Sequence, residues 1–300
     1  MDRLHAMSVF VAVAEEESFA AAARRLNLSP PAVTRTIAAL EAHVGIQLLT
    51  RTTRFVRATD AGLRYLESAR RLLTEADEAD EAAAGIHATP RGQLTVTAPV
   101  LFGAMHVMPG IVDFLSRYPA VTVSAVFLDR VVNLLEEGMD VGIRIGELPD
   151  STMRAIAVGS VKRVICAAPA YLAAHPQPLE PRDLAGHTII SASTASPGLE
   201  WRLGASQPVS VKIQPRLTTN TNAAAIEAAR QGLGITRLMS YQVAAELADG
   251  RLVRLLPDWE SAPLPVHIVH QEGRQASAKV RTLVDVLAQH LRGNPALSAH

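Results

Sequence analysis

Arginine is the residue type whose placement in this sequence points most directly to a chemistry. Between Ser18 and Arg71 there are nine arginines and three acidic residues, a local surplus of six positive charges, although the whole chain has a net charge of zero. The run Arg51-Thr52-Thr53-Arg54 lies in this segment. A local positive field attracts phosphate groups even when the molecule is neutral as a whole. The segment is therefore predicted to contact the backbone of a nucleic acid.

Patterns that support catalysis or metal binding do not occur in the sequence. Ten histidines are scattered along it, and there is no HExxH, GxSxG, P-loop or GxGxxG motif. His267 and His270 are three residues apart in a predicted strand, so their side chains diverge. Cys166, the sole cysteine, lies in an apolar run and can form neither an internal disulfide nor a cysteine-based metal site. We therefore expect a protein that is not an enzyme and has no metal or cofactor.

The arginine-rich segment is predicted to fold into short helices. A first helix ends in the glutamate run 15–17, and Ser18 is a suitable N-cap for a second helix over residues 19–26. Residues 27–29 form the turn that follows. Small alanine side chains fill the second helix and allow another helix to approach closely. This succession is typical of a helix-turn-helix.

The third helix, predicted over residues 30–44, has two different faces. Pro30 suits its first position, where the missing N–H has no partner to lose, and Gly45 ends it. The apolar face that should pack inward carries Val33, Ile37, Leu40 and Val44. The opposite face carries Pro31, Thr34, Arg35 and Ala38. Arg35 can bind guanine through two hydrogen bonds, and Thr34 can contact a phosphate or a thymine methyl group.

Residues 48–59 alternate in polarity and predict a β-hairpin after the third helix. Arg51-Thr52-Thr53-Arg54 then forms the tip of a wing that lies along the DNA backbone or in the minor groove. The alternative is an ordinary soluble helical bundle with exposed arginines. The caps, the turn length and the hairpin agree with one another, and together they favour the winged helix-turn-helix.

The motifs follow one another in a distinctive order: residues 18–35, Ile37, Leu40-Glu41, Gly45, Leu48-Leu49, Arg51-Thr52-Thr53-Arg54, Thr59 and Gly62. This order resembles the DNA-binding region of LysR-type transcriptional regulators, and the resemblance extends over essentially the whole chain. It implies DNA contacts by Pro30, Pro31, Thr34, Arg35 and Arg54. Many relatives have Gln in place of Pro30 and Ser in place of Thr34, which bears on the preferred DNA sequence. The complete set of expected DNA contacts is Ser29, Pro30, Pro31, Thr34, Arg35, Arg51, Thr52, Thr53 and Arg54.

A long helix is predicted after the hairpin, because residues 63–84 contain neither proline nor glycine. Apolar and small side chains recur on it at alternating spacings of four and three, which is a heptad seam: Tyr65, Ala69, Leu72, Ala76, Ala79 and Ala83. A single solvated helix is the alternative, whereas the family resemblance implies a dimerisation helix. Gly85, Pro90 and Gly92 mark a hinge before the next domain.

Beyond residue 92 the predicted strands alternate with helices, as in α/β domains with a largely parallel sheet. Strands are predicted over residues 93–98, 121–128, 141–145, 164–168, 209–217, 235–239 and 266–270, and helices over 106–117, 131–137, 170–174, 223–231 and 277–291. The last strand and helix are expected to return to the first half. Two such halves with a cleft between them form a periplasmic-binding-protein-like fold, with lobe I at about 92–160 and 264–300 and lobe II at about 161–263.

Ligands of open α/β sheets bind beyond the carboxyl ends of the strands. This rule and the family resemblance place effector contacts at Pro99, Val100, Leu101, Phe102, Ile145, Gly146, Thr194, Thr219, Asn220, Thr221 and Thr236. Hydroxyl groups and helix N-termini favour a carboxylate. We expect a small organic anion whose apolar part lies against Leu101 and Phe102. The alternative for residues 219–221 is that they only cap a helix.

The sequence thus predicts an α+β chain: a winged helix-turn-helix over residues 1–60, a linker helix and hinge over 61–91, and an effector-binding domain over 92–300. The predicted function is sequence-specific transcriptional regulation on double-stranded DNA, modulated by a small-molecule effector. A homodimer or homotetramer is expected, and the resemblance favours the tetramer.

A solute-binding protein is the main alternative, and it leaves the N-terminal part unexplained. A metabolic enzyme fused to a DNA-binding head is the other alternative, and it lacks catalytic motifs. No apolar run approaches the ~20 residues that span a membrane, and the N-terminus does not resemble a signal peptide. We therefore expect a cytoplasmic protein without a membrane partner.

Overall fold

The computed structural model describes residues 2–51, 56–84, 89–148, 153–192, 200–271 and 277–297. The chain divides into two compact units, Met1–Ala88 and Thr89–His300, and each is described by itself. Among the helices in these ranges, none combines the length and the apolar character that crossing a membrane requires.

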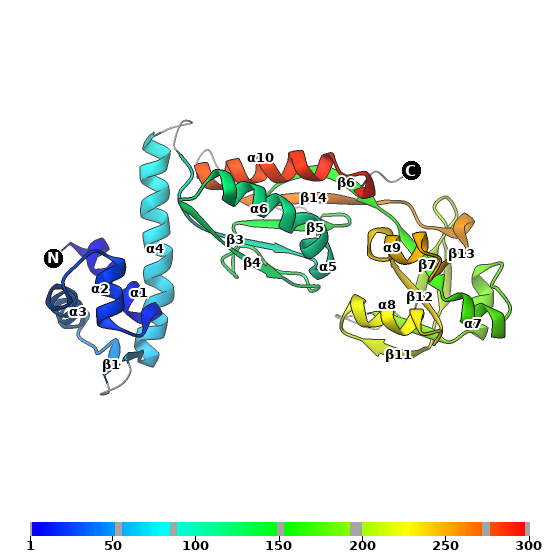
Figure 1. Ribbon diagram of the computed structural model, residues 1–300, viewed down its shortest axis with the longest axis horizontal. Coiled ribbons are helices and arrows are strands. Elements are labelled where there is room, and N and C mark those ends of the chain that lie inside the picture. Colours follow the sequence, from blue (N-terminus) through cyan, green and yellow to red (C-terminus); the bar gives the residue numbers. More distant parts are fainter. Residues whose placement is uncertain are drawn as a thin grey trace. The chain divides into compact units, whose positions relative to one another are not determined.

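The N-terminal unit consists of four helices and a hairpin (Figure 1). Its elements are α1 (Arg3–Glu16), α2 (Phe19–Arg25), α3 (Pro30–Val44), β1 (Leu49–Arg51), β2 (Val56–Ala58) and α4 (Asp60–Ala84). The Oγ atom of Ser18 accepts a hydrogen bond from the N–H of Ala21 at 3.2 Å and so caps α2. Ser29 caps α3 in the same way, and Gly45 ends it with a left-handed φ of 76°. The predicted helix boundaries and caps are confirmed to within a residue or two.

Apolar side chains from all four helices and the hairpin form the core of the N-terminal unit. Val33, Ile37 and Leu40 are fully buried, as their spacing on α3 predicts. The prediction for Val44 was wrong: its exposed fraction is 37%, because it stands at the last position of α3, where the helix reaches past the core.

The long helix α4 is packed into the same core at its N-terminal end. The ring of Tyr65 meets the ring of Phe10 on α1 edge to face, with 5.4 Å between centroids. Ala69, one turn further along, is fully buried. The first two residues of the predicted seam are therefore packed inside the unit, whereas Leu72, the third, is exposed.

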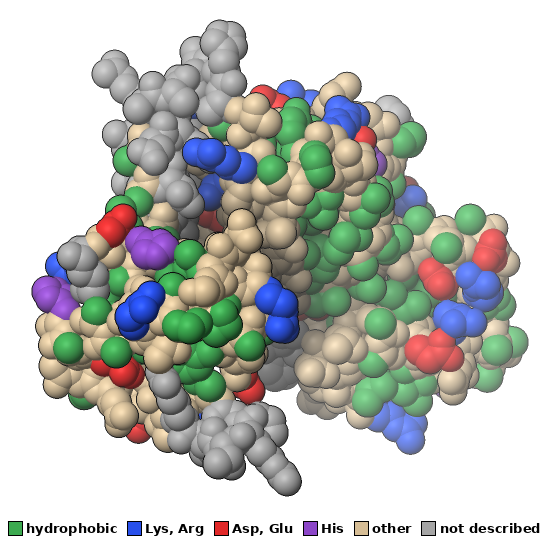
Figure 2. Space-filling model, turned by 60° about the vertical axis from the view of Figure 1, so that its left-hand side comes forward, with side chains coloured by type: hydrophobic (Ala, Val, Ile, Leu, Met, Phe, Trp, Pro, Cys, Tyr) green, Lys and Arg blue, Asp and Glu red, His purple; other side chains and the backbone are tan. Residues whose placement is uncertain are grey.

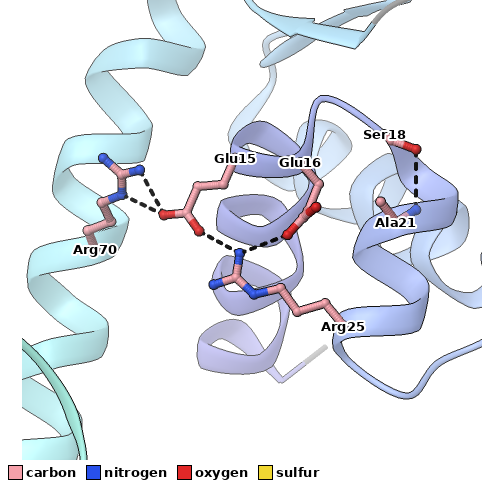
Figure 3. A network of polar contacts seen from close by, with 6 residues as sticks. All are labelled: Glu15, Glu16, Ser18, Ala21, Arg25 and Arg70. Carbon is pink, nitrogen blue, oxygen red and sulfur yellow. Dashed lines mark hydrogen bonds and ion pairs between the residues drawn. The ribbon is translucent and has the colours of Figure 1, made fainter. Parts of the chain in front are cut away.

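Ion pairs join α1, α2 and α4 at one end of the unit (Figure 3). The Glu15 carboxylate pairs with Arg25 and with Arg70, both at 2.7 Å. Burial of Glu15 raises the pKa of its carboxyl group, but the hydrogen bonds from Arg25 and Arg70 outweigh it, so that the net pKa lies below its ordinary value. The ion pairs of Glu15 therefore stabilise the folded unit fully above the ordinary pKa of a glutamate. This contribution to the free energy of unfolding is lost as the pH falls through the lowered pKa of Glu15.

Two five-stranded sheets make up most of the C-terminal unit. Lobe I has the strand order β4-β3-β5-β14-β6, formed by β3 (Gly92–Ala98), β4 (Val121–Phe127), β5 (Val141–Ile145), β6 (Met153–Val161) and β14 (Leu264–Gln271). Its helical segments are α5 (Val100–Phe102), the π-helix η2 (Gly103–Val107), α6 (Met108–Arg117), α10 (Ala278–Arg292) and the short turn η6 (Pro295–Leu297). Helices α6 and α10 lie side by side against this sheet (Figure 1).

Lobe II has the strand order β11-β8-β12-β7-β13. Its strands are β7 (Arg163–Ala167), β8 (Ile189–Ala192), β11 (Pro215–Thr219), β12 (Ile235–Met239) and β13 (Val253–Leu255). A separate hairpin is formed by β9 (Glu200–Leu203) and β10 (Val209–Lys212). The α-helices of this lobe are α7 (Pro169–Ala174), α8 (Asn222–Arg230) and α9 (Ala244–Ala248). Its 3₁₀ turns are η3 (Pro181–Gly186), η4 (Ser240–Val243) and η5 (Pro257–Trp259). The return of the last strand and helix to the first sheet is confirmed.

Three predictions for this unit were wrong. The sheets are mixed, because each contains two parallel and two antiparallel pairings. In lobe I the antiparallel pairings are those of β14 with β5 and β6, and in lobe II they are those of β7 with β12 and β13. The strand predicted over residues 209–217 is two strands, β10 and β11, in different sheets.

The helix predicted over residues 131–137 is a turn. The side-chain oxygen of Asn133 accepts a hydrogen bond from the N–H of Leu135 at 3.2 Å, and such local bonds compete with a helix. Val131 and Leu135, four residues apart, are exposed, whereas Val132 and Leu134 are buried. The buried apolar side chains are therefore two residues apart, a spacing that does not form one face of a helix.

Candidate nucleic-acid interface and ligand cavity

The outward face of α3 is the part of the N-terminal unit that resembles a DNA-reading surface. Ser29, Pro30, Pro31, Arg35 and Ala38 are exposed, and Thr34 is half-buried, while the opposite face of the helix is in the core. Exposed side chains at the N-terminal half of such a helix can reach base edges, and the first N–H groups can reach a phosphate. Five expected DNA contacts, Ser29, Pro30, Pro31, Thr34 and Arg35, are thus brought together on one surface.

Arg35 differs from its basic neighbours in the charges around it. Arg25 and Arg70 are held by Glu15, which takes up part of the positive surplus of the segment. Among the described residues, no carboxylate lies within ion-pair distance of Arg35. On the face drawn in Figure 2, Lys and Arg side chains lie as separate groups, some of them beside Asp or Glu side chains.

The hairpin is anchored to α3 by Glu41, a residue whose role the sequence did not reveal. Its Oε1 atom accepts hydrogen bonds from the N–H groups of Leu48 and Leu49 at 2.8 and 3.0 Å. At the other end of the hairpin the Thr59 hydroxyl donates to the Gln47 carbonyl oxygen at 2.9 Å. An acidic residue inside a strongly basic segment is the signal that could have drawn attention to this position.

Close packing at the start of α4 also holds the hairpin in place. A Cβ atom on Gly62 would lie 2.0 Å from the carbonyl oxygen of Leu48, so that only glycine fits there. Thr52, Thr53 and Arg54, the predicted wing tip, lie outside the described residues, and Arg51 is described only by its backbone in β1.

A cavity of about 340 Å³ lies between the two lobes of the C-terminal unit. Lobe I contributes Pro99, Leu128, Asp129, Arg130, Val131, Ile143, Arg144 and Ile145. Lobe II contributes Arg163, Ala192, Asn220, Asn222, Arg237, Leu238, Met239, Tyr241 and Gln242. The volume lies within the range of small-molecule sites, roughly 300–1,000 Å³.

Three of the expected effector contacts, Pro99, Ile145 and Asn220, line this cavity. The others among the described residues do not: Val100, Leu101, Phe102, Gly146, Thr219, Thr221 and Thr236. Phe102 and Thr236 are fully buried. Thr221 caps α8, since its Oγ accepts a hydrogen bond from the N–H of Ala224 at 3.3 Å. Thr194 lies outside the described residues.

Phe102 belongs to a contact that ties the lobes together. Tyr241, on the lobe II turn η4, packs into the lobe I core with its ring centroid 5.2 Å from that of Phe102 and 5.4 Å from that of His106. Burial raises the pKa of the Tyr241 hydroxyl, which stays neutral. Because Tyr241 also lines the cavity, a ligand there can act on this packing.

Arginine side chains, rather than hydroxyl groups, dominate the chemistry of the cavity. Among the described residues that line it, the acid is Asp129 and the bases are Arg130, Arg144, Arg163 and Arg237. Arg130 pairs with Glu137, and Arg144 donates to the carbonyl oxygen of Val132. These two side chains are therefore already engaged within lobe I.

Arg163 and Arg237 are the basic residues that lobe II contributes to the cavity wall. Arg237 pairs with Ile165 across β12 and β7, so that Arg163, two residues from Ile165, projects from the same face of the sheet. Burial, and then the charge of Arg163, lower the pKa of Arg237 to about 10. No carboxylate of the described chain pairs with either guanidinium, and the Nε of Arg237 is buried without a hydrogen-bond partner.

Other bonds fix the position of Arg237. Its Nη2 atom donates to the Arg202 carbonyl oxygen at 2.7 Å and to the Ser261 hydroxyl at 2.8 Å, and its guanidinium carbon lies 5.9 Å from the centre of the Trp201 ring. A guanidinium that is held in place and lacks a carboxylate is a suitable receptor for an anion. Its neighbour Arg163 was not predicted, because residues 163 and 237 meet only through strand pairing.

Comparison with known families agrees with both parts of the chain. Residues 4–63 match the family described as bacterial regulatory helix-turn-helix protein, lysR family, and residues 87–292 match the LysR substrate binding domain. The chain belongs to the LysR family of transcriptional regulators. It is a DNA-binding regulator with an effector-binding domain, and a solute-binding protein without a DNA role is not favoured.

Individual LysR-type relatives match over nearly their full length. The regulator PtxR of Pseudomonas aeruginosa is 35% identical over 97% of this chain and 94% of its own. The activator AaeR of Escherichia coli is 33% identical over the same shares. The solved structure of CrgA from Neisseria meningitidis has a TM-score of 0.62 and 31% identity over 97% of this chain and 99% of its own. That of AphB from Vibrio cholerae has a TM-score of 0.62 and 27% identity over 96% and 99%.

A Glu41→Ala variant of this LysR-type regulator is expected to lose about 1.5–3 kcal/mol of unfolding free energy, because bonds to a charged acceptor are removed from two backbone N–H groups. DNA affinity is expected to fall as well, since the hairpin loses its attachment to α3. Chemical denaturation and fluorescence anisotropy with promoter DNA measure the two effects. Glu67→Ala, an exposed acid on α4, is the control, and equal losses in both variants would contradict the anchoring role.

Proposed function

We propose that this LysR-type regulator reads DNA with the exposed face of α3 and with its wing. The proposed contacts are Ser29, Pro30, Pro31, Thr34, Arg35, Arg51, Thr52, Thr53 and Arg54. The exposed, carboxylate-free position of Arg35 beside the helix N-terminus is the observation that supports base recognition. The sequence domains 1–60, 61–91 and 92–300 are proposed as its working parts.

We further propose that a small organic anion binds in the cavity and modulates DNA binding. The observation that carries this proposal is the pair Arg163 and Arg237, two cations on neighbouring strands without a carboxylate partner in the described chain. The apolar part of the ligand is then placed against Ile143, Ile145 and Leu238, which line the same cavity, rather than against Phe102. The pocket is proposed to bind its ligand without converting it.

The regulator is proposed to act in the cytoplasm as a homodimer or homotetramer. Two copies of the DNA-reading surface fit a roughly palindromic DNA site, because each copy can read one half-site.

Gel-shift binding to DNA upstream of the protein's own gene tests the DNA role. Affinity that falls steeply with salt concentration is expected, since phosphate contacts release counterions. Binding without any salt dependence would count against it.

An Arg237→Ala variant is expected to bind organic anions about 10–150-fold more weakly than the wild type, because bonds between charged groups are worth about 1.5–3 kcal/mol. Calorimetry with a panel of aromatic and aliphatic carboxylates, alongside the corresponding neutral amides, measures the change. Arg216→Ala removes an exposed arginine of β11 outside the cavity and serves as the control. Binding of neutral or cationic compounds alone would overturn the proposed ligand class.

A further inference from the structure

Asp129 is the acid in the wall of the cavity, and its carboxylate touches both lobes. It lies two residues after the end of β4 in lobe I. Its Oδ1 atom accepts a hydrogen bond from the backbone N–H of Val100 at 3.0 Å. Its Oδ2 atom accepts one from the side-chain amide of Asn222 at 3.3 Å. Val100 belongs to lobe I, whereas Asn222 is the first residue of α8 in lobe II.

The two donors are of the kind that a carboxylate ligand requires. A backbone N–H and a side-chain amide, each directed at one oxygen of the same carboxylate, form a receptor with two separate bonds. Asn222 and Pro99, the residue before Val100, both line the cavity, so that the receptor opens on the space assigned to the ligand. In this structure the chain's own carboxylate occupies the receptor.

We propose that Asp129 is an internal competitor of the effector and so determines the affinity and the selectivity of the cavity for carboxylates. This inference rests on the proposed function, in which the ligand is an organic anion. A carboxylate held against Arg163 and Arg237 takes over the N–H of Val100 and the amide of Asn222 and displaces Asp129. Displacement exchanges one anion for another at the same two donors. It also breaks the hydrogen bond between Asp129 of lobe I and Asn222 of lobe II.

A purely local role for Asp129 makes a different prediction. If the carboxylate only caps the N-terminal end of α5 through Val100, the bond to Asn222 is incidental. Asn222→Ala then leaves both ligand binding and the exchange behaviour of α8 unchanged. Competition instead requires Asn222, because it is one of the two donors that ligand and Asp129 share.

Two substitutions separate these roles. Asp129→Asn keeps an oxygen acceptor for Val100 but turns the other oxygen into an amide donor that faces the donor amide of Asn222. It therefore replaces the bond between Asn222 and a charged acceptor by a weaker contact between two neutral amides, and it removes the internal negative charge. Asn222→Ala removes the shared donor and leaves the Val100 bond in place. Asp113→Asn, which neutralises an exposed carboxylate paired with Arg117 on α6, is the matched control.

The test is calorimetric titration of the full-length wild type, both single variants, the double variant and the control with benzoate, salicylate, succinate and inorganic phosphate. Asp129→Asn is expected to bind at least one carboxylate about five- to tenfold more tightly than the wild type, the equivalent of one ordinary hydrogen bond. The gain is expected to disappear in the double variant, and Asp113→Asn is expected to match the wild type.

Deuterium exchange without ligand gives a second, independent reading. The amides of residues 221–226 are expected to exchange at least about threefold faster in Asp129→Asn and in Asn222→Ala than in the wild type.

Carboxylate binding that is equal or weaker in Asp129→Asn, or a gain that persists in the double variant, would overturn the competition while leaving the anion site intact. If neither the wild type nor any variant binds a probe, the proposed anionic effector fails and the competitor with it.

Discussion

Replacing Phe10 with alanine is expected to lower the unfolding free energy of the N-terminal unit by about 3–5 kcal/mol, which is a large share of the stability of a small domain. Phe10 is fully buried on α1 and meets the ring of Tyr65 on α4. The truncation leaves a cavity between the first and last helices, and it removes an aromatic pair worth about 0.5–1.5 kcal/mol beyond burial. The substitution thus loosens the helix frame that presents α3.

Amide exchange resolved along the chain is the suitable measurement for Phe10→Ala. Trp201 and Trp259 are the two tryptophans, and both belong to the C-terminal unit, so that tryptophan fluorescence does not follow the N-terminal one. Faster exchange is expected in α1, α3 and α4, with β3 and β14 unchanged. Leu4→Ala, on the same helix but 46% exposed, is the control and should change stability by less than about 0.5 kcal/mol. Similar losses in the two variants would show that the ring pair does not hold the unit together.

An Arg35→Ala variant is expected to lose about 1–3 kcal/mol of binding free energy at the preferred DNA site and to discriminate less well between sites. The physical reason is the planar guanidinium, which donates two parallel hydrogen bonds to a guanine edge. Arg35→Lys keeps the charge but not this geometry, so it should retain attraction for any duplex and lose most of the selectivity.

Fluorescence anisotropy at one fixed salt concentration, with promoter DNA and a scrambled duplex, measures both affinity and selectivity for Arg35. Arg117→Ala changes the net charge by the same amount and lies on α6 in the other unit, so it is the matched control. Equal affinity of the wild type and Arg35→Ala for promoter DNA would remove α3 from the proposed interface.

The N-terminal unit could be predicted closely because its determinants are local. The caps of α2 and α3 are bonds between residues three positions apart, and the left-handed turn at Gly45 depends on that residue alone. The buried face of α3 follows from helical periodicity. The error at Val44 and the missed anchor Glu41 have a common cause, since both depend on how far other elements reach over the end of α3.

The cavity was predictable only in outline. The rule that ligands bind beyond strand ends led to Pro99, Ile145 and Asn220, which do line it. The position of Arg163 close to Arg237 was not predicted, because side chains 74 positions apart become neighbours only through the register of β7 with β12. The predicted hydroxyl-rich site gave way to a basic one for that reason.

The amino-acid sequence by itself determined the elements of the N-terminal unit, their caps, the outward face of α3 and the two-part plan, because these follow from interactions within a few residues of one another. The tertiary structure alone decided that the sheets are mixed, that four arginines share one cavity, and that Asp129 bridges Val100 and Asn222. Those arrangements depend on strand register and on the approach of two lobes, and neither is encoded in the spacing of residues along the chain.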